Sequence, residues 1–258
     1  MKIAVLASGG VDSSVTLKLL KEQGHDITAY YIKIWLEDEV AFLGDCPWEE
    51  DIDYVRRICE REAIPLKIIS MQREYWDNVV QYTLDEVKQG RTPSPDIFCN
   101  QRIKFGLFYD RIDDSFDKVA TGHYASSEEK DGVTYLKMAA DPVKDQTYFL
   151  AHLSQEQLQR AMFPIGAYQK SKIRELAEKF ELPNSRRKDS QGICFIGEVK
   201  MQDFLRQYVP DEPGPIVRAT DGQVLGRHRG LHYYTIGQRR GIGVPSNADF
   251  QKYVVVGK

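Results

Sequence analysis

The feature that most constrains this chain lies at its N-terminus, where a short apolar run meets a glycine turn. Residues 3–6 are apolar and suit a buried parallel strand, which the Ser-Gly-Gly turn at 8–10 then interrupts. Apolar residues recur at a spacing of four from Val11 to Leu19 and predict an amphipathic helix. Backbone N–H groups and the dipole of that helix converge at the turn, so the sequence predicts an anion site there.

Polar side chains give this turn a phosphate-binding character. The hydroxyls of Ser8, Ser13 and Ser14 can donate to phosphate oxygens, and Asp12 can hold Mg²⁺ or position pyrophosphate through it. The chain has neither G-x-x-x-x-G-K-S/T nor G-x-G-x-x-G, which argues against γ-phosphoryl transfer and dinucleotide binding. An ordinary glycine turn is the alternative, but the full pattern S-G-G-V-D-S-S resembles the PP-loop of ATP pyrophosphatases. That resemblance implies that pyrophosphate leaves and that the substrate is adenylated.

Composition indicates a globular protein and limits its partners. The chain has 258 residues, 42% of them apolar, and a net charge of −3, so its overall charge does not indicate nucleic-acid binding. Residues 218–240, however, contain five arginines and one acid, which allows a basic face in the C-terminal part. No apolar run approaches the ~20 residues of a membrane span, and the four cysteines include no C-x-x-C pair. The N-terminus enters a strand at once, so we expect no signal peptide, no membrane and a cytoplasmic, reducing location.

Strands and helices alternate through the first half of the chain. Residues 26–34, 66–70 and 118–121 are rich in β-branched, aromatic or other apolar residues and predict strands, whereas residues 47–62 and 74–88 have helical apolar faces. This alternation predicts an α/β fold with a doubly wound parallel sheet that is covered on both sides.

The C-terminal part of the chain has a different character. From residue 213 onward, short alternating segments and a D-G turn predict a small β-rich unit. We therefore expect a catalytic domain over residues 1–198 and a small, β-rich domain over residues 199–258.

The segment around Cys99 indicates a reactive thiol. Two prolines bracket Ser94, so we expect residues 92–96 to form an extended, stiff loop, and a helix to begin at Cys99 or Asn100. A helix N-terminus lowers the pKa of a thiol and favours the nucleophilic thiolate. Asp96, three residues earlier, can serve as a base or an orienting group. The alternative for Cys99 is a buried small hydrophobe, against which its place beside a carboxylate and basic residues argues.

Two further positions could touch a ligand. Gly122 and His123 end the predicted strand at 118–121, where doubly wound sheets admit ligands. His123 can contact nucleotide or substrate, and a structural histidine is an equal alternative. Cys194 lies in a glycine-containing loop or short strand.

Six motifs occur together and in order along the chain. They are S-G-G-V-D-S-S at 8–14, G-R-T-P-S-P-D-I-F-C-N at 90–100, T-G-H-Y at 121–124, K-D-Q-T-Y-F-L at 144–150, D-S-Q-G-I-C-F-I-G-E at 189–198 and G-Q-R-R-G-I-G at 237–243. With these motifs, essentially the whole chain resembles the tRNA-specific 2-thiouridylases, enzymes that thiolate the wobble uridine. The resemblance implies a PP-loop domain with an adenine nucleotide alpha hydrolase-like fold.

The resemblance also implies an ATP-dependent reaction at C2 of the uridine. ATP adenylates the C2 oxygen, which then leaves as AMP when sulfur attacks. The base must leave its stack to reach such a site, at a cost of about a few kcal/mol that is smallest in a single-stranded anticodon loop. The positions that match the family's ATP-binding residues are Leu6, Ala7, Ser8, Gly9, Gly10, Val11, Asp12, Ser13, Ile32 and Gly122.

Three residues would carry the sulfur chemistry by resemblance. Cys194 matches a cysteine that carries a persulfide, received from a cysteine desulfurase or a sulfur-relay protein. Cys99 matches the nucleophile, which helps to release sulfide or closes a disulfide with Cys194, and Asp96 matches the acid/base. The implied substrates are wobble-uridine tRNAs of the Lys, Glu and Gln type, and the positions that match tRNA-contacting residues are Ser94, Pro95, Asp96, His123, Lys144, Asp145 and Gln146.

Several alternatives stay open at the level of sequence. Some family members hold an iron–sulfur cluster on the positions of Asp96, Cys99 and Cys194, although we favour the persulfide. The chain departs from the family at Ser94 and Ala7, and it stops before the C-terminal β-barrel into which we expect family members to continue. Either the protein lacks that barrel or the sequence is incomplete. Another PP-loop enzyme, such as an amidotransferase or ligase, would also use the loop. So would a truncated paralogue that binds nucleotide or a sulfur-carrier partner without turnover.

Overall fold

The computed structural model describes residues 1–34, 48–189, 201–245 and 252–258 of the chain. Its contacts divide the chain into two units. The first unit comprises residues 1–79 and 95–198, and the second comprises residues 80–94 and 199–258.

A five-stranded parallel sheet organises the first unit, as the sequence predicts. Its strand order is β3-β2-β1-β4-β7, and every neighbouring pair is parallel. The strands are β1 (Lys2–Leu6), β2 (Asp26–Lys33), β3 (Leu66–Ser70), β4 (Lys118–Ala120) and β7 (Ala161–Met162). The chain first adds β2 and β3 on one side of β1, and it then adds β4 and β7 on the other side. Doubly wound sheets bind ligands at the carboxyl ends of the strands where this reversal occurs.

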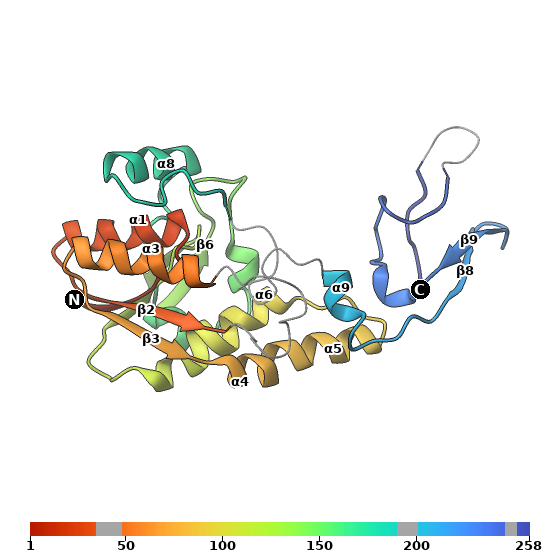
Figure 1. The fold of residues 1–258 in the computed structure, drawn as a ribbon, viewed down its shortest axis with the longest axis horizontal. Coiled ribbons are helices and arrows are strands. Elements are labelled where there is room, and N and C mark those ends of the chain that lie inside the picture. The colour runs from red at the N-terminus through yellow and green to blue at the C-terminus, as the bar shows by residue number, and fades with distance from the viewer. Residues whose placement is uncertain (35–47, 190–200, 246–251) are drawn as a thin grey trace. The chain divides into compact units, whose positions relative to one another are not determined.

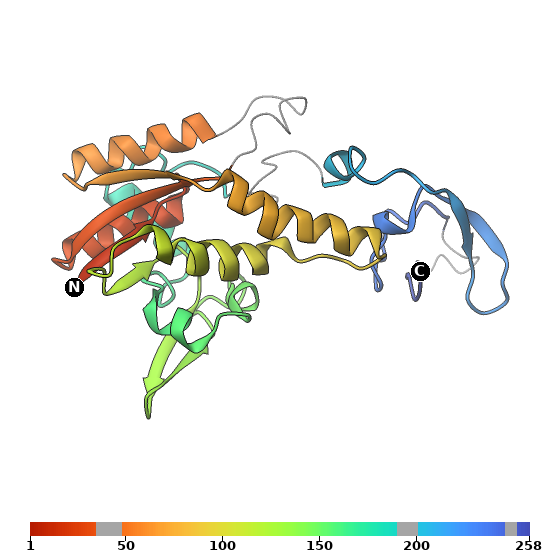
Figure 2. The same ribbon diagram turned by 90° about the horizontal axis from the view of Figure 1, so that it is seen from below.

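Helices cover both faces of this sheet, which confirms the predicted fold class. The helices α1 (Val11–Glu22) and α3 (Trp48–Arg61) lie on one face, and α8 (Lys170–Lys179) packs beside α1 (Figure 1). The opposite face carries a helix that is formed by α6 (Pro95–Phe98) and the π-helix η3 (Cys99–Leu107) (Figure 2).

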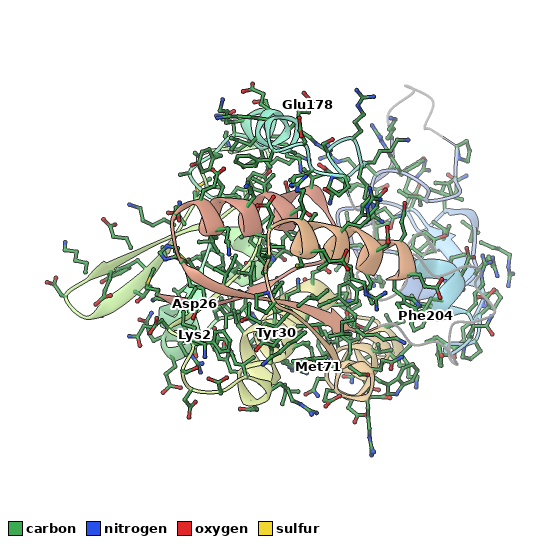
Figure 3. All side chains as sticks on the ribbon, turned by 60° about the vertical axis from the view of Figure 1, so that its left-hand side comes forward. Lys2, Asp26, Tyr30, Met71, Glu178 and Phe204 are labelled. Carbon is green, nitrogen blue, oxygen red and sulfur yellow. The ribbon has the colours of Figure 1, made fainter. Side chains whose placement is uncertain are left out.

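Strand β2 shows how the two faces differ. Ala29 and Tyr31 belong to the core that α1 and α3 cover, whereas Tyr30 points to the other face. There the Tyr30 ring meets Phe108 and Phe116 edge-on, at centroid distances of 5.2 and 5.8 Å. Figure 3 shows Tyr30 on the side of the sheet away from α1 and α3. Because side chains alternate across a strand, a strand that is apolar at successive positions requires cover on both faces.

Short elements complete the first unit. They are α4 (Gln72–Tyr75), η4 (Tyr109–Arg111), β5 (Ser126–Lys130), β6 (Val133–Lys137), η5 (Thr147–Leu150) and α7 (Gln155–Arg160), with the π-helix η2 (Trp76–Val80) at the junction to the second unit. Strands β5 and β6 pair antiparallel through Asp131 and Gly132, whose φ angles of 52° and 76° fit the type I′ turn that joins such hairpins.

The second unit contains the small β-rich region that the sequence predicts. Its elements are α5 (Gln81–Lys88), α9 (Met201–Leu205), β8 (Gly214–Val217), β9 (Val224–His228) and η6 (Leu231–Tyr233). Strands β8 and β9 form an antiparallel hairpin with an irregularity at Ile216 and Val217. Within the described ranges, no helix is both long and apolar enough to cross a membrane.

Replacing Tyr30 with alanine should lower the free energy of unfolding by about 3–5 kcal/mol, because truncating a buried aromatic ring leaves a cavity. Tyr30 is 1% exposed. Tyr135 in β6 is 52% exposed, so the matched control Tyr135→Ala should change that free energy by no more than about 0.5 kcal/mol. Urea denaturation of the two variants measures the difference, and equal losses would contradict the packing around Tyr30.

Candidate active site

The turn between β1 and α1 is shaped by its own hydroxyls. Ser13 Oγ accepts the N–H of Ser8 at 3.1 Å and donates to the carbonyl of Gly10 at 3.0 Å. Ser14 Oγ donates to the same carbonyl at 2.9 Å. The first N–H groups of a helix have no partners within the helix, so those at the start of α1 are donors that face the turn. The turn therefore presents the backbone donors that an anion site requires.

Two glycines allow neighbouring elements to approach this turn closely. Gly9 has a φ of 77°, and a Cβ atom there would lie 2.6 Å from the carbonyl oxygen of Asp51 in α3. A Cβ atom on Gly122, just after β4, would lie 2.8 Å from the backbone nitrogen of Ser13. Side chains at these positions would push α3 and the end of β4 away from the turn. Gly122 therefore lies against the first turn of α1, and its predicted role in binding adenosine stays a prediction.

The segment after α8 holds the turn from outside. Asn184 is 1% exposed, and its Nδ2 donates to the carbonyl of Gly9 at 2.7 Å and to Ser14 Oγ at 2.9 Å. Arg187 donates to the same Gly9 carbonyl at 3.2 Å and forms an ion pair with Asp51 at 2.5 Å. Burial raises the pKa of Asp51, although the hydrogen bond and charge of Arg187 oppose that shift. The turn is thus tied to two parts of the chain that are distant in sequence.

Asp12, the acid of the S-G-G-V-D-S-S pattern, lies in an ion cluster. The Nζ atom of Lys170, the first residue of α8, lies 2.8 and 2.9 Å from the two carboxylate oxygens of Asp12. The Tyr124 hydroxyl donates to Asp12 Oδ1 at 2.9 Å, and the Lys170 ammonium lies 5.6 Å from the centre of the Tyr124 ring. Burial and the charge of Asp12 raise the pKa of Tyr124, so the phenol stays protonated.

Asp189 continues this cluster. Its carboxylate pairs with Lys170 at 2.8 Å, with Lys144 at 2.8 Å and with Arg174. Burial raises the pKa of Asp189, but the hydrogen bonds and charges of Lys144 and Lys170 outweigh burial and hold that pKa well below its ordinary value. Asp189 is therefore ionised at neutral pH.

The helix that carries Asp96 and Cys99 begins earlier than the sequence predicts. It starts at Pro95 rather than at Cys99 or Asn100, so the expected extended loop over 92–96 is shorter. The prediction was wrong because a proline fits the first position of a helix, where its missing N–H costs nothing. Cys99 consequently lies one turn inside the helix, at 1% exposure. Asp96 and Cys99 are three residues apart and share a face of this helix.

The change to π-helix at Cys99 brings further residues to that face. Residues five apart are hydrogen-bonded neighbours in a π-helix, which places Lys104 one π-turn after Cys99. Asn100 is 2% exposed; its Nδ2 donates to the carbonyl of Phe149 at 3.0 Å, and its Oδ1 accepts from the Lys104 ammonium at 3.0 Å. Burial raises the pKa of Asp96, and the charge of Lys104 only partly opposes that shift. A carboxyl group with a raised pKa suits acid/base chemistry near neutral pH.

His123 lies close to this helix. Its Nδ1 forms a 2.8 Å hydrogen bond with the Thr121 hydroxyl, and its ring lies 6.4 Å from those of Phe105 and Phe163. Burial, reinforced by the charge of Lys104, holds the pKa of His123 well below its ordinary value. The imidazole is therefore neutral at physiological pH, and its predicted contact with tRNA stays a prediction.

Besides Lys144, which pairs with Asp189, the other two side chains of the K-D-Q segment also have partners inside the protein. Asp145 accepts the N–H of Ala139 at 2.7 Å and that of Thr147 at 3.2 Å. Gln146 is bonded to Tyr124 twice, through its side-chain oxygen at 2.9 Å and its backbone N–H at 2.8 Å. The segment thus fixes Tyr124, which in turn holds Asp12, and it leaves Lys144 half-exposed.

The remaining predicted residues are Cys194 and the segment from Ser94 to Asp96. Cys194 lies outside the described residues, so its distance from Cys99 is not described. Ser94 is the last residue of the second unit's first segment, and Pro95 and Asp96 open the helix in the first unit. In the described part of the chain, no group of three or more His, Cys, Asp or Glu side chains could hold a metal ion.

Sequence reasoning missed Lys170, Asn184 and Asp189 as site residues. Asp189 opens the D-S-Q-G-I-C motif and could have been noted there. Lys170 and Asn184 lie in stretches that carry no recognised pattern, and only the fold brings them to the turn.

The strand order, the reversal at β1 and β4, and the S-G-G-V-D-S-S turn define a PP-loop nucleotide-binding domain of the α/β class. Residues 1–198 match the family model described as a tRNA methyl transferase HUP domain, and residues 202–258 match the tRNA methyl transferase PRC-barrel domain. The chain belongs to the family of tRNA-specific 2-thiouridylases, as the similarity to its relatives shows.

Two relatives illustrate this similarity. The chain is 50% identical over 244 residues to the tRNA-specific 2-thiouridylase MnmA of Parabacteroides distasonis, which covers 95% of this chain and 68% of the relative. It is 48% identical over 258 residues to the protein of the same name from Akkermansia muciniphila, which covers 100% of this chain and 72% of the relative. Among solved structures, the U34-tRNA thiolase NcsA from Methanococcus maripaludis is 21% identical with a TM-score of 0.44, covering 71% of this chain and 57% of that chain.

The environment of His123 predicts a pH effect on stability. Its pKa is lower in the folded chain than the ordinary value of 6.5, so below about pH 6.5 the unfolded chain binds a proton that the folded chain does not. Burying neutral His123 therefore costs no stability above about pH 6.5. Below that pH, the free energy of unfolding falls by up to about 1.4 kcal/mol per pH unit because of this residue. When the pH falls from 7 to 5.5, the free energy of unfolding of His123→Gln should therefore decrease by about 1 kcal/mol less than that of the wild type.

The control is His152→Gln, since His152 is exposed, and its free energy of unfolding should decrease as much as that of the wild type. Urea denaturation at the two pH values measures these changes. An identical pH dependence of stability in all three proteins would contradict the placement of His123.

Proposed function

We propose that this protein is a tRNA-uridine 2-sulfurtransferase, which thiolates C2 of the wobble uridine in an ATP-dependent reaction in the cytoplasm. The observation that carries the proposal is that one unit holds both the PP-loop turn and a helix with Asp96 and Cys99 on one face. The identity of 50% to a named thiouridylase supports it.

The first step is adenylation of the uridine. The C2 oxygen attacks the α-phosphorus of ATP, the bond to the β-phosphate oxygen breaks, and pyrophosphate leaves. Backbone N–H groups at the start of α1 are suited to stabilise the charge that develops on the departing phosphates. The base loses its N3 proton in this step, and Asp96 accepts that proton, because its raised pKa makes it a better base than an ordinary carboxylate.

The second step transfers sulfur. The outer sulfur of a persulfide on Cys194 attacks C2, and AMP leaves with the former C2 oxygen. The thiolate of Cys99 then attacks the inner sulfur and forms a disulfide with Cys194. The outer sulfur stays on C2, and Asp96 returns the proton to N3, which gives the thiocarbonyl. A small thiol reductant afterwards returns both cysteines to the reduced state.

Two inorganic groups belong to this proposal. Asp12 would hold Mg²⁺, because a carboxylate beside a phosphate site is the hard oxygen ligand that this ion prefers, and the ion would neutralise phosphate charge there. An iron–sulfur cluster on Asp96, Cys99 and Cys194 is the alternative sulfur carrier. Only Asp96 and Cys99 of that set are described, and we derive no step through a cluster.

The proposed partners follow from this chemistry. They are wobble-uridine tRNAs of the Lys, Glu and Gln type and a cysteine desulfurase or sulfur-relay protein. Lys144 is the exposed cation of the proposed tRNA-contacting set, which also includes Ser94, Pro95, His123, Asp145 and Gln146. We further propose that residues 1–198 are the catalytic domain and that the arginine-rich stretch at 218–240 of the β-rich domain contributes to tRNA affinity.

In vitro thiolation of an unmodified wobble-uridine tRNA tests this function. With ATP, Mg²⁺ and a persulfide-loaded desulfurase, we expect 2-thiouridine from the wild type by mass spectrometry. Cys99→Ala and Cys194→Ala should each lower the rate by at least about a thousand-fold, because removing a nucleophile removes its covalent step. Both variants should still release pyrophosphate when tRNA is present, because adenylation precedes the cysteine chemistry.

Cys59 provides the matched control. It is a cysteine in the core at 2% exposure, and burial raises its pKa to about 12, so it is not a thiolate at neutral pH. Cys59→Ala should retain full thiolation once its folding is verified. Thiolation that survives the loss of both Cys99 and Cys194, or a methylated product instead of a thiolated one, would contradict the proposed function.

A further inference from the structure

We propose that Lys170 binds the pyrophosphate portion of ATP, and that Asp189 positions Lys170 for this role. In the structure, the Lys170 ammonium pairs with both Asp12 and Asp189. When a divalent cation takes the Asp12 carboxylate, the ammonium keeps Asp189 as a partner and can also meet phosphate oxygens. The inference rests on the proposed function only for the identity of the nucleotide.

The location of the ammonium is the first support. Lys170 Nζ is within 2.8–2.9 Å of both carboxylate oxygens of Asp12, which is the second residue of α1. The first turn of α1 presents the backbone donors of the anion site. The Lys170 ammonium therefore borders the place where the phosphates would lie. Its side chain is only 13% exposed, so its charge is less screened by water than that of a surface lysine.

The charges around Asp189 give the second support. Asp189 accepts from Lys144 and Arg174 as well as from Lys170, so its carboxylate is neutralised without Lys170. Asp12, in contrast, has Lys170 as the cation that contacts it among the described residues. A divalent cation on Asp12 would leave the Lys170 ammonium beside a carboxylate that already has two other cations. A lysine ammonium in that position is a point charge of the kind that binds phosphates.

The third support is that groups other than Asp12 and Asp189 also hold Lys170 in place. Asp141 Oδ2 accepts the backbone N–H of Lys170 at 2.9 Å at the start of α8, and α8 packs against α1. The Tyr124 ring lies beside the side chain, with its centre 5.6 Å from Nζ. Little side-chain freedom remains to be lost when the ammonium changes partners, and such preorganisation favours binding.

The same contacts would also fit an ion pair that only stabilises the fold. Binding measurements separate the two roles, because a merely structural pair would change stability and leave the affinity for phosphates unaltered in the folded protein. The probes are inorganic pyrophosphate with Mg²⁺, the analogue α,β-methylene ATP with Mg²⁺, and adenosine, which has no phosphate.

The experiment is isothermal titration calorimetry of the full chain as wild type, Lys170→Gln, Lys170→Arg and Lys172→Ala. Lys172 lies on the same helix and pairs on the surface with Glu175 at 2.8 Å, so it is the matched control. We expect Lys170→Gln to lower the affinity for pyrophosphate and for the ATP analogue by about ten- to a hundred-fold, because the variant loses a charged hydrogen bond. Lys170→Arg should restore most of this affinity, and adenosine should bind all four proteins equally.

Each outcome decides the proposal. Unchanged pyrophosphate affinity in Lys170→Gln, with a lower unfolding temperature, would overturn it and leave a structural ion pair only. If Lys170→Gln fails to fold, Lys170→Arg decides. A folded Lys170→Arg variant that binds pyrophosphate more than about ten-fold more weakly than the wild type would contradict the proposal that the charge at this position binds the phosphates. Failure of the wild type to thiolate tRNA, with pyrophosphate binding that still depends on Lys170, would contradict the proposed function and support this inference.

Discussion

Close backbone approach at the turn between β1 and α1 is the constraint on which the rest of the site depends. Gly9 touches the backbone of α3 at Asp51, and Gly122 touches the backbone of α1 at Ser13. Neither contact tolerates a side chain, so strand, helix and neighbouring strand meet without intervening bulk. The hydroxyls of Ser13 and Ser14 then satisfy the carbonyl of Gly10, and the free N–H groups of the first helical turn are left as donors. The anion site is thus a consequence of backbone packing more than of any charged side chain.

Most of the fold could be predicted from the sequence, because periodicity and turn residues are local signals. The strand at 66–70 has the bounds that the pattern predicts, and the alternation of strands and helices gives the parallel sheet. The start of the helix before Cys99 could not be predicted in this way. The sequence P-S-P allows both an extended loop and a helix that begins at the second proline, and tertiary packing of Pro95 and Ile97, both buried, decides between them.

The ion cluster marks the limit of what sequence can reveal about the site. Asp12 and Lys170 are 158 positions apart, and Lys170 stands in a stretch without a motif. Its importance arises from the docking of α8 against α1, which no local pattern encodes. Asp189 is an intermediate case, since its motif drew attention to Cys194 and not to the carboxylate that opens it. Pairs of opposite charge from distant segments become visible only when the fold brings them together.

Environment gives three aspartates of this site different properties. Asp96 is desolvated with one opposing cation nearby, so its pKa rises above its ordinary value, which makes it a better base. Asp189 is also partly buried, but three cations hold it in the ionised form. Asp12 differs from both, because its carboxylate, beside the turn between β1 and α1, is paired with a single ammonium. In our proposal, a divalent cation replaces that ammonium. Although the chain has a net charge of −3, Lys144, Lys170 and Arg174 gather around Asp189, and Lys170 joins this group to Asp12 in the first turn of α1. Local clustering of cations, which net charge conceals, therefore sets the electrostatics beside the turn.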